Sequence, residues 1–316
     1  MIRSAIRILG SLVFSALLGM VPVTQATAYT TQVTTPRVTA TLVSEYDTIV
    51  PGQPLWVALH FEIIPEWHTY WSNAGDSGNP PVIDWQLPEG FRASDIHWPY
   101  PERLPVGPLM NYGYSKQSTL LVRIIPPPSL TTGQSVTLHA SASWLVCKVE
   151  CIPEEGFFMP SLPVSSADDQ VATEWADTLR AARQRLPAPL PWDAVVDVAS
   201  DTLQLQVELP GIDEPQLEDV YFYPAKYGIV EHAAEQRQQI DNGTLSLQLT
   251  RGDLRSQTLD QLDGVLVMRE ATADGPVTRA FTVAIPAAVR PASESSIPFT
   301  LILLFALLGG ILLNIM

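Results

Sequence analysis

The sequence has few cysteines and few positive charges. It contains two cysteines, Cys147 and Cys151, and three lysines among its 316 residues. With 18 Lys and Arg residues against 33 Asp and Glu residues, the formal net charge is −15 at pH 7. An acidic surface of this kind repels phosphates and anionic lipid headgroups. The composition therefore argues against nucleic-acid binding.

Charges are absent from two apolar segments, one near each end of the sequence. Near the start, Arg3 and Arg7 precede an uncharged stretch from Ile8 to Val23, which is followed by the small-x-small cleavage site Ala26-Thr27-Ala28. This pattern predicts a secretory signal peptide over residues 1–28. The mature chain would then have a formal charge of −17 and would work outside the cytoplasm, where disulfides persist.

The second apolar segment, Ile297 to Met316, has no charged residue and is long enough to cross a bilayer. The cytoplasmic end of a membrane helix usually carries Lys or Arg, and the sequence stops without such a flank. We therefore expect residues 297–316 to be the first transmembrane helix of a protein that is truncated at this point. A tail anchor is the alternative, and it would also require a basic flank.

Between these ends the sequence favours β-strands. Alternating or β-branched apolar runs occur at 37–44, 54–64, 118–125, 134–147, 156–164, 203–209, 219–224, 244–250, 264–270 and 278–285. Short strands with this spacing predict immunoglobulin-type sandwiches, and Asp241-Asn242-Gly243 predicts a hairpin turn. A helix over roughly 169–185 and a Pro-rich linker separate the two groups. We expect an all-β chain with two immunoglobulin-like β-sandwich domains, over 29–165 and 166–290.

The first of these domains is expected to carry the chemistry. It contains both cysteines and six of the eight tryptophans, at positions 56, 67, 71, 85, 98 and 144. The second domain has no cysteine and no residue cluster to which we would assign chemistry. It is expected to act as a spacer or docking platform.

The two cysteines are four positions apart. On a straight strand their Cα atoms would be about 13 Å apart, whereas a disulfide needs about 4.4–6.8 Å. Residues 148–150 are therefore expected to turn the chain. A five-residue ring contributes only about 2 kcal/mol to stability, so a redox-active pair is favoured over a structural disulfide. A metal site is the third interpretation, but such sites recruit further Cys or His ligands, and no His lies near this pair.

Acidic residues surround the pair. Glu150, Glu154 and Glu155 outnumber Lys148, so their field is expected to raise the pKa of the thiols. A raised pKa suits a dithiol that reacts only when a docked partner changes its surroundings. The alternative is that these glutamates are solvated surface residues.

Two other patterns suggest different functions. "AGDSGNPP" (74–81) is similar to the serine-protease motif, but His60 and His68 lie within seventeen residues of Ser77, too close for that fold. Instead of a protease site, we expect residues 74–81 to form a Gly/Asn/Pro-rich loop that could shield the cysteines. A set of aromatic residues could instead line a groove for a carbohydrate or peptide, although such residues more often pack in the core: Trp67, Tyr70, Trp71, Trp98, Tyr100, Tyr112 and Tyr114. A non-catalytic binding module with a structural disulfide is therefore the alternative function.

Several segments together resemble one family. They are "WLVCKVECIPEEG" (144–156), "WHTYWSNAGDSGNPPVIDWQLPEGF" (67–91), "IHWPYPERL" (96–104), "NYGYSKQSTLLV" (111–122) and the terminal "LLFALLGGILLNIM". These residues resemble the N-terminal periplasmic region of the thiol:disulfide interchange protein DsbD family, in its ScsB-like branch. The resemblance covers most of 35–165 and the last 18 or so residues.

The resemblance implies an electron relay. A membrane domain and a thioredoxin-like periplasmic domain would pass electrons to the immunoglobulin-like domain, which would reduce periplasmic thiol oxidoreductases or isomerases. The resemblance places residues 29–290 in the periplasm as part of an inner-membrane protein. It also implies that Cys151 forms mixed disulfides and that Cys147 resolves them. Thiol–disulfide exchange needs no cofactor or metal. Copper handling follows only from the resemblance and thiolate softness, and no Met or His cluster supports it.

Overall fold

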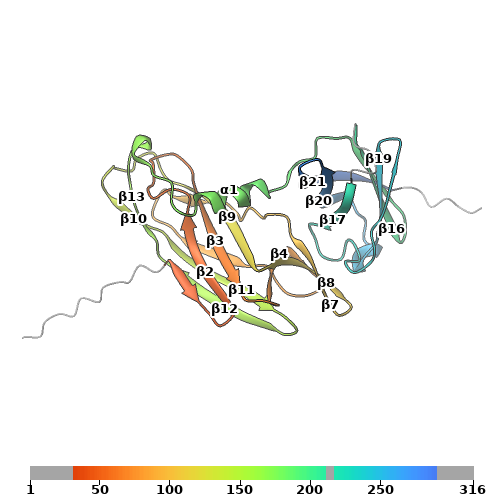
Figure 1. Cartoon of the computed structure of the whole chain (residues 1–316), viewed down its shortest axis with the longest axis horizontal. Coiled ribbons are helices and arrows are strands. Elements are labelled where there is room, and N and C mark those ends of the chain that lie inside the picture. The colour runs from red at the N-terminus through yellow and green to blue at the C-terminus, as the bar shows by residue number, and fades with distance from the viewer. Residues whose placement is uncertain (1–30, 211–216, 290–316) are drawn as a thin grey trace, which may run out of the picture.

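The computed structural model describes residues 31–210 and 217–289 (Figure 1). Within them the regular secondary structure is nearly all β-strand, with one short α-helix, which confirms the all-β prediction. The predicted signal peptide (1–28) and the predicted membrane helix (297–316) lie outside the described residues. Among the residues that are described, none forms a helix of the length and apolarity that a membrane span requires.

The first region, β1 to β13 with α1, is a sandwich of two sheets. One sheet has the order β1-β2-β3-β9-β6, the other has the order β12-β11-β4-β8-β7, and β5 pairs with β11. The strands are β1 (Gln32–Thr34), β2 (Val38–Ser44), β3 (Leu55–Ile63), β4 (His68–Gly75), β5 (Val82–Gln86), β6 (Arg92–Ala93), β7 (Glu102–Val106), β8 (Leu109–Ser115), β9 (Gln117–Ile125), β11 (His139–Cys147) and β12 (Cys151–Phe158). A separate two-stranded ladder joins β10 (Ser135–Thr137) and β13 (Ser161–Pro163).

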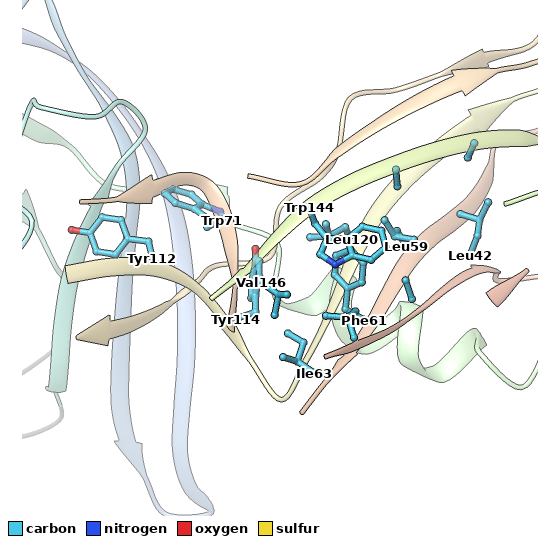
Figure 2. Close-up of a cluster of buried hydrophobic side chains, with 14 of the residues drawn as sticks. Leu42, Leu59, Phe61, Ile63, Trp71, Tyr112, Tyr114, Leu120, Trp144 and Val146 are labelled. Atoms are coloured by element: carbon cyan, nitrogen blue, oxygen red, sulfur yellow. The ribbon is translucent and has the colours of Figure 1, made fainter. Parts of the chain in front are cut away.

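The main core lies between these two sheets. Alternate residues of β11 face inward, including Trp144 and Val146, and they meet Leu59 and Phe61 of β3 (Figure 2). The rings of Phe61 and Trp144 are 5.0 Å apart. Burying side chains of this size supplies most of the driving force for folding.

The central strands β3 and β9 are buried on both faces. A short helix, α1 (Ala176–Gln184), covers their outer face, where Leu179 and Ala182 pack against Ala58 and Leu121. Figure 1 shows α1 next to β9 and β3. This cover explains why the middle of each strand is apolar on both faces, whereas Glu62 of β3 and Arg123 of β9 are exposed.

The helix is shorter than the predicted range of 169–185. The preceding residues are extended, because they pair with the segment after β2: Thr173 N donates to Glu45 O (3.0 Å), and Asp47 N donates to Val171 O (3.0 Å). A 3-10 turn, Ala167–Asp169, lies before them. The prediction of a helix start near 169 was therefore wrong, since backbone pairing with a distant segment overrides the local helical pattern.

The second region, β14 to β21, is one sheet that folds over a single core. Its order is β17-β20-β21-β15-β16-β19-β18, and β14 pairs with β21. Its strands are β14 (Ala188–Pro189), β15 (Ala194–Val198), β16 (Thr202–Glu208), β17 (Leu217–Pro224), β18 (Arg237–Asp241), β19 (Thr244–Thr250), β20 (Gln261–Thr272) and β21 (Gly275–Val289). Both arms contribute to one buried cluster. Asn242 and Gly243 have positive φ angles between β18 and β19, which confirms the predicted hairpin turn.

The two regions are packed against each other. Tyr221 and Tyr223 of β17 belong to the same buried cluster as Trp71 and Tyr112 of the first region. In Figure 2 these last two side chains lie at the end of the first core, beside the strands of the second region. The hydroxyls of Tyr112 and Tyr221 are 3.0 Å apart, and Arg103 donates to Asp219 over 2.6 Å.

Candidate functional site

The two cysteines form a disulfide at the tip of the β11–β12 hairpin. Cys147 ends β11, Cys151 begins β12, and they are directly opposite in the ladder. Their Cα atoms are 4.2 Å apart and the sulfurs are bonded. Residues 148–150 make the connection, so the turn predicted from the spacing is confirmed.

The disulfide lies on the outer face of its sheet. Opposite residues of an antiparallel pair project to the same face, and successive residues alternate. The neighbouring pair, Val146 and Ile152, faces the core. Cys147 and Cys151 therefore face away from it, as does the pair Leu145 and Pro153.

The two sulfur-bearing residues differ in burial. Cys147 is 3% exposed and packs with Tyr70, Ala74 and Leu145. Cys151 is exposed. A reactant from solution therefore meets Cys151 first, while Cys147 is covered by the end of β4.

Tyr70 links the disulfide to the rest of the fold. Its hydroxyl is 3.4 Å from Cys151 Sγ. The side chain is fully buried, and this desolvation raises the pKa of Tyr70, partly offset by a hydrogen bond with the Ser77 side chain. The hydroxyl therefore keeps its proton at neutral pH and can donate it in a hydrogen bond. His68, directly opposite Cys147, contacts the Tyr70 ring edge-on, and burial lowers the pKa of His68.

The Gly- and Pro-rich loop after β4 covers Tyr70. Gly78 has φ +87°, and a Cβ atom there would lie 2.1 Å from Tyr70 Cζ, so only glycine fits against the ring. Ser77 Oγ donates to Asn111 Oδ1 over 2.9 Å. The hydrogen-bond partner of the Ser77 hydroxyl is therefore an amide, which cannot act as a general base. The loop leaves Cys151 exposed.

The acidic residues near the pair have different surroundings. Glu154 faces inward, where Thr35 Oγ1 (2.5 Å) and Trp144 Nε1 (3.3 Å) donate to it and Arg37 forms an ion pair at 3.5 Å. Glu155 is on the outer face and exposed. The charge of Glu154 is therefore compensated by a residue 117 positions away, which sequence reasoning missed because no local pattern links them.

The hairpin tip forms a second ion pair. Lys148 Nζ donates to Glu66 Oε2 over 2.7 Å, and this hydrogen bond lowers the pKa of Glu66. Beside this pair lies a cavity of about 620 Å³ with apolar walls that include Ile63, Trp67 and Leu104. At the tip itself, Val149 is 89% exposed.

The aromatic residues named from the sequence divide into two sets. Tyr70, Trp71, Tyr112 and Tyr114 are buried, while Trp67, Trp98 and Tyr100 are partly buried and pack against the main core. This supports core packing rather than a carbohydrate groove. Over the described ranges 31–210 and 217–289, no three His, Cys, Asp or Glu residues are grouped so that they could hold a metal ion.

Comparisons with known proteins match a family model to the first region and a solved structure to most of the chain. The family model described as "Thiol:disulfide interchange protein DsbD, N-terminal" matches residues 39–162. The N-terminal periplasmic domain of ScsB from Proteus mirabilis matches in structure with a TM-score of 0.58 and 17% identity, covering 81% of this chain and 98% of that chain. No curated protein sequence matches.

Two further solved structures are matched with much lower scores. The titin domains z1z2 in complex with telethonin give a TM-score of 0.19 at 13% identity, covering 81% of this chain and 100% of that chain. A protein of unknown function from Porphyromonas gingivalis gives 0.21 at 11% identity, covering 77% and 96%. Of these three matches, the one to ScsB has a score that supports the fold. Residues 39–162, which contain the cysteine hairpin, are therefore a DsbD/ScsB-like N-terminal domain.

Proposed function

We propose that residues 29–290 are the periplasmic thiol–disulfide exchange part of a DsbD/ScsB-like protein-disulfide reductase. The observation that carries this proposal is a disulfide on the outer face of a DsbD-type domain, with Cys147 buried and Cys151 exposed. A disulfide that served only as a staple would contribute little across so short a loop.

The proposed reaction has two exchange steps. A thiolate of an electron-donating partner attacks Cys151 Sγ and forms a mixed disulfide, while Cys147 leaves as a thiolate and takes a proton. The partner's second thiolate then attacks the partner sulfur that is bonded to Cys151. This forms a disulfide within the partner and releases Cys151 as a thiolate. Two electrons have passed to the pair, and the partner is oxidised to a disulfide. The same steps in reverse, with Cys151 attacking and Cys147 resolving, reduce a disulfide of the acceptor.

The roles of the two cysteines follow from their exposure. Exchange requires in-line access to the sulfur that is attacked, and Cys151 provides it. Cys147 lies under Tyr70 and Ala74, where a large partner is excluded but an attack on an adjacent mixed disulfide remains within reach. Cys151 is thus the proposed nucleophile and Cys147 the resolving residue.

The surroundings of the hairpin fit a protein partner. The apolar cavity is lined in part by Lys148, and Lys148 and the exposed Val149 lie in the turn that joins the two cysteines. In the proposal a thioredoxin-like periplasmic domain of the same relay docks here, and periplasmic thiol oxidoreductases or isomerases use the same surface as electron acceptors.

The proposal also assigns the segments outside the described residues and the domain limits. Residues 1–28 would direct export and 297–316 would be the first transmembrane helix in the inner membrane. Of the expected domains 29–165 and 166–290, the first would also include α1, which packs against Ala58 and Leu121. These assignments depend on sequence patterns and on the family context.

A trapping experiment with matched variants tests the function. A thioredoxin-like partner whose resolving cysteine is replaced by serine is mixed with the oxidised chain, and we expect it to accumulate a mixed disulfide with Cys151. Cys147→Ser and Cys151→Ser distinguish the roles: the reduced Cys147→Ser variant should form stable mixed disulfides with an oxidised partner, and the Cys151→Ser variant should not. Equal trapping by both variants would contradict the assigned roles. If neither traps a partner and reduction only lowers stability, the alternative of a binding module with a structural disulfide is correct.

A further inference from the structure

The segment from Asn73 to Gly78 connects the disulfide site to the second region. On one side Gly78 lies against the ring of Tyr70, whose hydroxyl contacts Cys151. On the other side Asn73 Nδ2 donates to Pro224 O over 2.8 Å. His232 Nδ1 donates to the Asp76 carboxylate, also over 2.8 Å.

The hydrogen bond of Asn73 is buried, and that of His232 is partly buried because the Asp76 side chain is 16% exposed. His232 is 2% exposed and Asn73 is 6% exposed. Asn73 and Asp76 also make hydrogen bonds within the first region. Asn73 Oδ1 accepts from Gly75 N at 3.1 Å, and Asp76 Oδ2 accepts from Met110 N at 2.7 Å. A buried polar group that loses its partner incurs a desolvation penalty. The segment is therefore most stable where the second region holds it.

We propose that His232 and the Pro224 carbonyl are positioning groups for the cysteine pair. They fix the 73–78 segment, so that Gly78 and Ser77 hold Tyr70 with its hydroxyl against Cys151 Sγ. The second region then takes part in the chemistry of the first, in contrast to the spacer role expected from the sequence. The inference rests on the proposed function in one respect only, that Cys151 is the reactive sulfur.

The effect on reactivity follows from the hydrogen bond. When the pair is reduced, the Tyr70 hydroxyl can donate to the Cys151 thiolate. A hydrogen bond to the charged form favours that form, so it raises the thiolate fraction at neutral pH. When the segment is released, Tyr70 is no longer held against the sulfur, and Cys151 alkylates more slowly.

The test measures iodoacetamide alkylation of Cys151 against pH, by mass spectrometry, on the full chain reduced with a phosphine. We expect His232→Leu to slow alkylation at pH 7 by about threefold to tenfold, the range for one hydrogen bond, and to move the pH midpoint upward. His232→Asn should restore the rate, because its amide can place a donor near the position of Nδ1. If His232→Leu does not fold, Asn73→Ser, which is too short to reach the Pro224 carbonyl, should slow the reaction in the same way.

Two further variants separate positioning from general loosening. Tyr70→Phe should slow alkylation by itself, and His232→Leu should add nothing in that background. Asp219→Asn removes an exposed ion pair between the same two regions but does not touch the segment, so it should leave the rate unchanged. An unchanged rate and midpoint in folded His232→Leu would overturn the inference, as would full additivity with Tyr70→Phe or an equal effect of Asp219→Asn.

The reductant here is a small molecule, so the result does not depend on exchange with a partner protein. A normal trapping result with an unchanged alkylation rate would refute the positioning role alone. Failure of trapping with a slowed rate in His232→Leu would refute the proposed function and leave the positioning role in place.

Discussion

The first and second regions use the two faces of their strands differently. In the second region, β16 and β19 alternate strictly, with buried Leu203, Leu205, Leu247 and Leu249 on one face and polar residues on the other. In the first region, the β11–β12 hairpin uses both faces: Trp144 enters the core, and Cys147 is buried under Tyr70 on the other side. Cys147 is buried beside the exposed Cys151 because Tyr70 covers the outer face of β11, whereas nothing comparable is needed on the polar faces of β16 and β19.

The regions also differ in how they bury charge. The first region holds the carboxylates of Glu45 and Glu154 in paired, mostly buried positions. In the second region the ion pair between Arg269 and Glu218 is half exposed on both sides, and the buried Glu270 has only a longer contact of 3.7 Å with the half-exposed Arg279. Substitution of Glu45 or Glu154 should therefore cost more stability than substitution of Glu218.

The largest effect should come from the two cores. Trp144→Ala should lower the free energy of unfolding by about 3–5 kcal/mol and Leu247→Ala by about 2–5 kcal/mol, because both leave cavities. Only Trp144→Ala should also raise the alkylation rate of Cys147 after reduction, since it loosens the hairpin. Urea denaturation and site-resolved mass spectrometry measure the two effects. An equal change in thiol reactivity in both variants would remove the distinction between the regions.

The next effect concerns the helix. Glu45 accepts two hydrogen bonds from Arg183 of α1, at 2.6 and 2.8 Å, so Glu45→Gln should cost roughly 1–3 kcal/mol. Amide protons of α1 should then exchange faster. The matched control is Glu218→Gln in the second region, which should stay within about 0.5 kcal/mol. Equal costs in the two variants would contradict the contrast in buried charge.

A third effect is the response to acid. Burial lowers the pKa of His60, His68 and His97, all in the first region. In the unfolded chain these groups bind protons near the ordinary value of about 6.5, so between that pH and their folded pKa the unfolded state binds more protons. Their stabilisation is present above about pH 6.5 and is lost as the pH falls through the folded values. Urea midpoints at pH 7.5, 6 and 5 should decrease in that order, and an increase would refute the assignment.

The smallest effect should come from the exposed glutamates of the hairpin. Glu155→Gln should lower the pKa of the Cys151 thiol slightly and speed alkylation, with an effect below about 1 kcal/mol because the charge acts through water. Glu154→Gln should instead reduce stability, since its carboxylate holds Thr35 and Trp144. If Glu154→Gln changes reactivity more than Glu155→Gln does, the inward carboxylate is the one that controls the thiol.

Local patterns in the sequence determined much of the fold. The apolar runs at 54–64 and 118–125 became β3 and β9, and the alternating runs at 203–209 and 244–250 became β16 and β19. The spacing of the cysteines required the turn at 148–150. These features depend on side-chain periodicity and chain geometry over a few residues, which a sequence displays directly.

Other elements were not visible in this way. The strands β4 and β8 were missed, because Gly and Asn residues interrupt their alternation ("HTYWSNAG" and "LMNYGYS"). The helix start was placed too early, since residues 171–173 pair with 45–47.

Only the tertiary structure decided the surroundings of the disulfide. Tyr70 is 81 residues from Cys151, and His232 is 156 residues from Asp76. Contacts between residues so far apart depend on how two sheets and two regions pack, and no local propensity records that packing. The sequence by itself determined that the two thiols would meet. The tertiary structure decided that one of them is buried, that Tyr70 touches the other, and that the second region holds the loop behind them, because each of these features is a buried contact between distant segments.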